Sequence, residues 1–91
     1  MAEEKILTKH PQGKSGKNIS KQKYDLLKQA ILEALHNREL THPELMDQLN
    51  VALTGKFPDN IGWYAETVKL DLEARNVVER TASKPAKYRL K

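Results

Sequence analysis

Three successive segments of the sequence repeat apolar residues at helical spacing, and each is bounded by residues that begin or end helices. For the first, Ser20 is a common helix cap, and Asn37 accepts the left-handed backbone that often ends a helix. Between them, apolar residues recur every three or four positions. These residues are Tyr24, Leu27, Ile31, Ala34 and Leu35. The pattern predicts a first helix over about residues 20–37.

The second segment begins with the clearest helix start in the chain. Thr41 can cap the helix, Pro43 falls in the first turn, and Glu44 stands three residues after Thr41, the spacing of a capping box. An apolar stripe follows before Gly55, made of Leu45, Met46, Leu49, Ala52 and Leu53. We predict a second helix over about 41–54, preceded by a brief strand in the link Arg38-Glu39-Leu40.

The third segment follows a turn over residues 56–60, where Asp59 or Asn60 can cap the next helix. Asn76 is the expected stop, so the third helix is predicted over about 60–75. Its buried stripe should consist of Ile61, Tyr64, Ala65, Val68 and Leu72, with Tyr64, Val68 and Leu72 packed against Leu27, Ile31, Leu35 and Leu49.

The last residues have the pattern of a β-hairpin over 77–90. Two short apolar-polar runs, 77–80 and 87–90, flank a turn in which the missing N–H of Pro85 costs no ladder hydrogen bond. The expected fold class is therefore mainly α with a small β-hairpin. Three helices followed by a hairpin is also the element order of a winged helix-turn-helix domain.

Two stretches carry a family resemblance. The run from Leu72 to Arg80, followed by Tyr88-Arg89-Leu90, resembles the end of the third helix and the wing in many bacterial transcription regulators. This resemblance covers residues 20–91 and implies a three-helix winged helix-turn-helix, a fold that binds DNA, RNA or proteins. Lys69 departs from it, since the regulators often have an apolar residue there. The run from Gly62 to Arg75 also resembles an uncharacterised family of short bacterial proteins.

Length and composition place this fold in one domain. The chain has 91 residues and no cysteine, which excludes disulfides and cysteine-ligated zinc and favours a reducing compartment, so we expect a cytoplasmic protein. No apolar run near the N-terminus is long enough for a signal peptide, and no stretch approaches membrane-spanning length, so we expect neither feature. Residues 1–19 show no regular period and are predicted to be a flexible basic arm, with a short extended piece at Ile6-Leu7.

No catalytic arrangement is recognisable. The three histidines, His10, His36 and His42, do not share helical spacing with a carboxylate in a metal-binding pattern. The Gly-Lys-Ser triplet at 13–15 lacks the earlier glycine of a phosphate loop, because position 8 is Thr8. The acidic residues are interpreted as solvated helix faces. We therefore expect a binding protein and not an enzyme, with no catalytic residue, metal or cofactor.

The charge distribution suggests the first binding hypothesis. The net charge is +4, but residues 1–23 carry +4 and residues 80–91 carry +5, so the middle of the chain is acidic. Basic ends can contact phosphate without reading sequence. We expect non-specific contact with duplex DNA or another nucleic acid through the wing and the arm. The candidate residues are Arg80, Lys84, Lys87, Arg89, Lys14, Lys17, Lys21 and Lys23.

The outer face of the third helix suggests the alternative. Helical spacing places Trp63, Leu70 and Ala74 opposite the buried stripe, beside acids that would repel a DNA groove. Trp63 and Leu70 either pack beneath the arm or the second helix, or form with Ala74 an exposed patch. In the second case the domain would bind a protein partner or form a homodimer, and no membrane contact is expected under either hypothesis.

Overall fold

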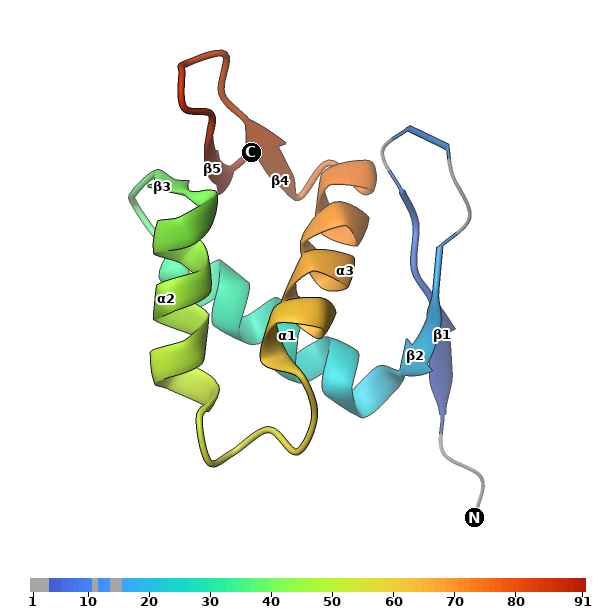
Figure 1. The fold of residues 1–91 in the computed structure, drawn as a ribbon. Helices are drawn as coiled ribbons and strands as arrows, with labels where there is room; N and C mark the ends of the chain where they lie inside the picture. Colours follow the sequence, from blue (N-terminus) through green and yellow to red (C-terminus); the bar gives the residue numbers. More distant parts are fainter. Residues whose placement is uncertain (1–3, 11, 14–15) are drawn as a thin grey trace.

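The computed structural model describes residues 4–10, 12–13 and 16–91, and these residues form three helices and two small antiparallel sheets (Figure 1). The helices are α1 (Lys21–Ala34), α2 (His42–Leu53) and α3 (Ile61–Ala74). The strands are β1 (Lys5–Leu7), β2 (Asn18–Ser20), β3 (Leu40–Thr41), β4 (Val78–Arg80) and β5 (Lys87–Leu90). The predicted helices and the predicted C-terminal hairpin are confirmed.

Local signals in the sequence set the helix ends. The Ser20 side chain accepts from the Lys23 amide, and the Asn60 side chain accepts from the Trp63 amide. Thr41 forms the predicted capping box with Glu44. Past α1 and α3, Asn37 and Asn76 adopt positive φ angles of 57° and 62°, and Gly55 does so after α2 at 79°. Asparagine and glycine enter this region at less cost than other residues.

The core lies where α1 crosses behind α2 and α3 (Figure 1). Val68 and Leu72 of α3 are fully buried in one cluster with Leu27, Ile31, Leu35 and Leu49, as predicted. Tyr64 differs from the prediction, because its ring is only half-buried. The ring meets Phe57 and Trp63 edge-on at the start of α3, where the helix leaves the core.

The C-terminal hairpin belongs to a three-stranded sheet in the order β3-β5-β4. Leu40 of β3 pairs with Tyr88, while Glu79 of β4 pairs with Arg89. The brief strand predicted between the first two helices is thus present, and it fastens the hairpin to the beginning of α2.

The N-terminal segment differs from the prediction of a flexible arm. Its strands β1 and β2 pair antiparallel, with Ile6 opposite Ile19, and the predicted extended piece Ile6-Leu7 lies in β1. Ile19 is buried in the core, and Thr8 is only 3% exposed. Burial of these side chains fixes the segment against the helices, although its strands are too short to show the alternating apolar pattern of a strand in the sequence. Gly16 permits the close approach of the two arms of this hairpin, since a Cβ there would lie 1.6 Å from the Thr8 carbonyl oxygen. We call residues 4–20 the N-terminal hairpin and residues 78–90 the C-terminal hairpin.

Within the described part of the chain, no helix combines the length and apolar character needed to cross a bilayer.

The capping box at the start of α2 predicts a pH dependence of stability. The Thr41 amide and hydroxyl donate to the Glu44 carboxylate and lower its pKa. A carboxyl group with a lowered folded-state pKa contributes stability above its unfolded pKa of about 4.3, and this contribution disappears as the pH falls through the folded-state value. We expect Glu44→Gln to be less stable than the wild type at neutral pH, with the difference shrinking below about pH 4 in urea denaturation series.

Asp47→Asn is the matched control, because Asp47 is an exposed acid on the same helix and forms no hydrogen bond with a described residue. A Glu44→Gln difference that stays constant from neutral to acidic pH would contradict the capping role.

Candidate functional site

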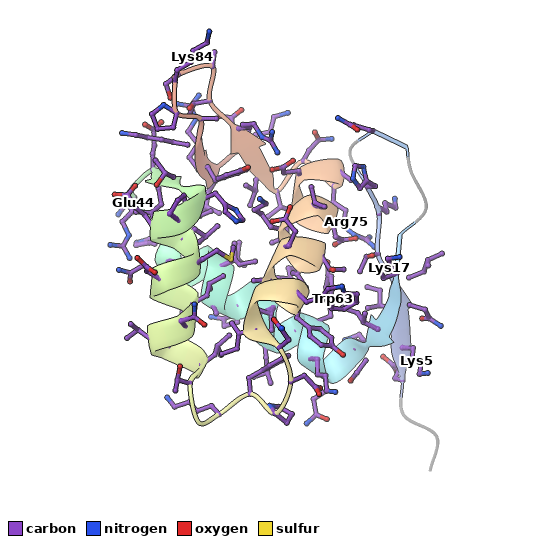
Figure 2. The ribbon with its side chains drawn as sticks, viewed as in Figure 1. Lys5, Lys17, Glu44, Trp63, Arg75 and Lys84 are labelled. Carbon is purple, nitrogen blue, oxygen red and sulfur yellow. The ribbon has the colours of Figure 1, made fainter. Side chains whose placement is uncertain are left out.

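The two lysines nominated on the C-terminal hairpin differ in their surroundings. Lys84 is exposed in the loop between β4 and β5, and it forms no ion pair with any residue that the structure describes (Figure 2). Lys87 is half-buried at the start of β5, where its charge helps to lower the pKa of Glu44. Of the two, Lys84 is the one available to an external anion.

The two nominated arginines of the same hairpin already face carboxylates. Arg80 lies 3.4 Å from a Glu73 carboxylate oxygen, and its guanidinium stacks 5.2 Å from the centre of the Tyr88 ring. Arg89 donates to Glu79 at 2.7 Å and to Glu39 at 2.8 Å, and both acids raise the pKa of Arg89. A phosphate at either arginine would have to share or displace these acids.

The nominated lysines of the N-terminal segment also separate into two groups. Lys17 is exposed and has no ion pair with a described residue, whereas Lys14 lies outside the described residues. Lys21 pairs with Asp25 at 2.9 Å, and these interactions raise the pKa of Lys21. Lys23 forms an ion pair with Asp59 and lies 5.5 Å from the Tyr64 ring centre. The start of α1 is therefore a set of paired charges.

The loops of the two hairpins project toward the same end of the molecule, on either side of the C-terminal end of α3 (Figure 1). Lys84 stands at the tip of one loop and Lys17 on the flank of the other (Figure 2). The candidate lysines without an ion pair to a described residue, Lys17, Lys84 and Lys87, thus lie on the two hairpins that flank α3, although they come from opposite ends of the chain.

The outer face of α3 is partly covered by the N-terminal hairpin. Leu70 and Thr67 line a cavity of about 90 Å³ whose other wall comes from residues 8–10 and 16–17. Leu70 and Ala74 are half-buried, while Trp63 is 46% exposed. Packing beneath the N-terminal segment, one of the two expectations, therefore holds for Leu70 and not for Trp63.

Lys69, which departs from the regulator pattern, is a buried lysine whose ammonium is surrounded by polar side chains. It is only 2% exposed, and its ammonium lies 3.1 Å from His42 Nδ1, 3.1 Å from a Glu66 oxygen and 3.2 Å from the Tyr88 hydroxyl. The same ammonium sits 4.3 Å from the centre of the Tyr88 ring. These partners offset the cost of burying the charge, and they connect α3 to α2 and to β5.

Asp71 contradicts the interpretation of all helix acids as solvated, because it has no exposed surface. Its carboxylate accepts from the Lys9 amide at 2.8 Å and from the Tyr24 hydroxyl. Arg75 Nε donates to both carboxylate oxygens, each at 2.9 Å. Burial and this bond raise the pKa of Tyr24, and the carboxylate raises the pKa of Arg75. Asp71 thus joins α3, α1 and the N-terminal hairpin.

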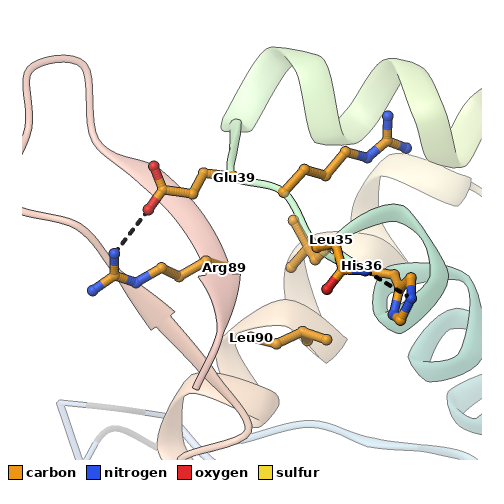
Figure 3. Close-up of a pocket in the computed structure, with 7 residues that line it drawn as sticks. Leu35, His36, Glu39, Arg89 and Leu90 are labelled. Atoms are coloured by element: carbon orange, nitrogen blue, oxygen red, sulfur yellow. Dashed lines mark hydrogen bonds and ion pairs between the residues drawn. The ribbon is translucent and has the colours of Figure 1, made fainter.

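A separate groove runs between the end of α1 and β5 (Figure 3). Its volume is about 340 Å³, and its floor includes Leu35 and Leu90. The Arg89–Glu39 ion pair spans one side, and His36 contacts Asn37 at the other (Figure 3). The groove is open, and its lining also includes Arg38, which donates to the Ala34 carbonyl and to the Gln48 side chain.

The part of the chain that matches a known protein family is nearly the same as the part that forms helices and strands. A model for a family of unknown function (DUF6958) matches residues 5–88, which include every helix and nearly all of both sheets. The chain belongs to the DUF6958 family. Searches of curated proteins and of solved structures found no match for the DUF6958 chain.

Sequence reasoning missed Lys9 and Asp71, two residues that organise this DUF6958 domain, and noted a third, Lys69, only as a departure from the regulator pattern. Spacing contained a signal for Asp71, which stands three residues after Val68 and seven after Tyr64, on the edge of the buried stripe. Lys9 gave no such signal, because it binds Asp71 through its backbone amide, which every residue except proline has.

Asp71→Asn should lower the free energy of unfolding by about 3 kcal/mol, because a buried carboxylate bound by several donors, one of them charged, would become a neutral amide. Urea denaturation measures this loss. Amide hydrogen exchange at Lys9 should accelerate more than exchange in the centre of α2, since only the former loses its acceptor. Asp47→Asn, on the exposed side of α2, is the charge-matched control; equal losses in the two variants would show that Asp71 has no special role.

Proposed function

We propose that this DUF6958 chain is a winged-helix module that contacts the phosphate backbone of nucleic acid through its two hairpin loops. The element order supports the winged-helix assignment: three helices are followed by a hairpin, and the short strand between the first two helices joins the sheet of that hairpin. On this proposal the C-terminal hairpin is the wing. The chain acts by binding, with no catalysis and no cofactor.

The observation that carries the proposal is that each hairpin has a candidate lysine that forms no ion pair with a described residue. Lys84 and Lys17 lie on loops that point to the same end of the molecule (Figures 1 and 2). Two separated cations on hairpins that flank the same helix can contact the backbone of a single duplex, and backbone contacts fix position without reading bases.

The outer face of α3 favours binding to phosphates over the reading of bases. Its outer face carries Glu66 and is partly covered by the N-terminal hairpin at Thr67 and Leu70. An acidic, covered helix is unsuited to the major groove, whose walls are phosphates. We therefore infer weak binding without sequence preference.

The paired cations limit the expected affinity. Arg80, Arg89, Lys21 and Lys23 each face a carboxylate, so each would release fewer counterions on binding than a free lysine. The effective contact should be smaller than the eight nominated residues suggest, with Lys17 and Lys84 contributing most.

The exposure of Trp63 favours a second candidate function, the binding of a protein partner. Exposed tryptophan is common at the centre of protein interfaces. Here, however, Leu70 and Ala74 are half-buried, so the three residues do not form a continuous exposed patch. Trp63→Ala should weaken such an interface and leave binding to nucleic acid unchanged.

The nucleic-acid proposal is tested by the salt dependence of binding to a labelled duplex, measured by fluorescence anisotropy. Each neutralised phosphate contributes about −0.9 to the slope of log affinity against log salt. The double variant Lys17→Ala and Lys84→Ala should therefore flatten the slope by about two units. The same slope with an unrelated duplex sequence is expected, because no base is read.

Lys56→Ala is the matched control, since Lys56 is an exposed lysine in the turn between α2 and α3, at the opposite end of the molecule (Figure 1). It removes one charge but should leave the slope within a few tenths of the wild-type value. No binding at low salt, or equal slope changes for Lys56→Ala and for either hairpin lysine, would overturn the proposal.

A further inference from the structure

The cavity between the N-terminal hairpin and α3 has the features of a small binding site. It is lined by Thr8, Lys9, His10, Gly16, Lys17, Thr67 and Leu70. Gly16 allows the two arms of the hairpin to approach each other at Thr8, just beyond the paired strands, and Leu70 lines the cavity from α3. The walls come from three segments of the chain, so the cavity is a product of the tertiary fold and not of one loop.

The size of the cavity restricts its occupant. Its volume of about 90 Å³ exceeds the roughly 10–15 Å³ that a single water needs. It is well below the roughly 300–1,000 Å³ of pockets that enclose a drug-sized molecule. A nucleotide cannot enter as a whole, whereas a single small ion or one substituent group of a larger molecule can.

The charge of the lining favours an anion. Lys9 and Lys17 both line the cavity, and neither forms an ion pair with a residue that the structure describes. The nearby carboxylate of Asp71 already accepts the Lys9 amide and the Arg75 guanidinium, so its charge is compensated. Two lysines without a carboxylate partner therefore border one small space.

The neutral groups of the lining add hydrogen-bond donors. His10 accepts the Gln12 amide at Nδ1, which places the hydrogen of the neutral ring on Nε2. Thr8 is buried and accepts the Lys17 amide at 2.8 Å, and its own hydroxyl hydrogen has no acceptor among the described residues. Ammonium, imidazole and hydroxyl donors around one cavity suit a multivalent oxyanion.

We propose that this cavity binds a single phosphate group, held by Lys9 and Lys17 with Thr8 and His10 as further donors. The group can be a free phosphate ion or one phosphate of a larger molecule, and the chemistry of recognition is the same. The site shares Lys17 with the proposed nucleic-acid contact but does not rest on it, because a free ion can occupy the cavity without any duplex.

The test is a titration of the whole chain with inorganic phosphate at constant ionic strength, with chloride making up the balance, followed by amide chemical shifts. We expect saturable shifts at the amides of Lys9, Lys17 and Thr67, and none in the β4–β5 loop. Lys9→Ala and Lys17→Ala should each weaken binding roughly tenfold, the loss expected from one charge-assisted hydrogen bond.

Two variants separate specific binding from a general effect of charge. Lys17→Arg keeps the charge and should keep most of the affinity. Lys56→Ala removes an exposed lysine outside the cavity and should leave the phosphate affinity unchanged. Linear, non-saturating shifts, or an equal loss in Lys56→Ala and Lys17→Ala, would overturn the inference.

Parallel titration with a short duplex distinguishes this inference from the proposed function. Phosphate binding at the cavity without duplex binding would support the inference and overturn the nucleic-acid proposal. Duplex binding through Lys84 with no response of the cavity amides to phosphate would overturn the inference and leave the nucleic-acid proposal in place.

Discussion

The arrangement of the domain depends on two buried charges of α3, Asp71 and Lys69. Residues two apart on a helix point about 200° away from each other, so these side chains leave α3 on opposite sides. Asp71 holds the Lys9 amide of the N-terminal hairpin, and Lys69 holds Tyr88 of the C-terminal hairpin. One helix thus fixes both hairpins, and this is why their loops lie at the same end of the molecule (Figure 1).

Burying two charges costs free energy unless each is fully hydrogen-bonded. The partners of Asp71 include Tyr24 and Arg75, and those of Lys69 include His42 and Glu66. The partners come from α1, α2, α3 and the hairpins, so the network is satisfied only when all of these elements are in place. The network therefore favours one relative placement of helices and hairpins, which an apolar core alone specifies less sharply.

The same placement determines which cations are available to a partner. The hairpin arginines lie near carboxylates of β4, the α1–β3 link and α3, whereas Lys84 in the β4–β5 loop and Lys17 next to β2 form no ion pair with a described residue. Net charge therefore overstates the basic surface. The fold presents a small number of lysines on the two hairpins, together with a cavity bordered by Lys9 and Lys17, and both features match phosphate better than bases.

Elements bounded by local signals could be predicted from the sequence. The capping box of Thr41 and Glu44, the stop at Asn76 and the C-terminal hairpin each depend on residues close together in the chain. The N-terminal hairpin could not be predicted, because Ile19 and Thr8 are buried by other parts of the chain and the Lys9 amide binds Asp71, 62 residues away. The pairing of Arg89 with Glu39 could not be predicted either, because the two residues are 50 positions apart in the sequence. The sequence alone therefore makes Arg89 look like an unpaired cation.

The most direct test of the account is amide chemical-shift mapping of the full chain with a short duplex at low salt. The account predicts shifts concentrated in residues 8–10 and 16–17 of one hairpin loop and 81–87 of the other, with the centre of α2 unchanged. Shifts along α3 at Trp63, Leu70 and Ala74, with both hairpin loops unaffected, would contradict it.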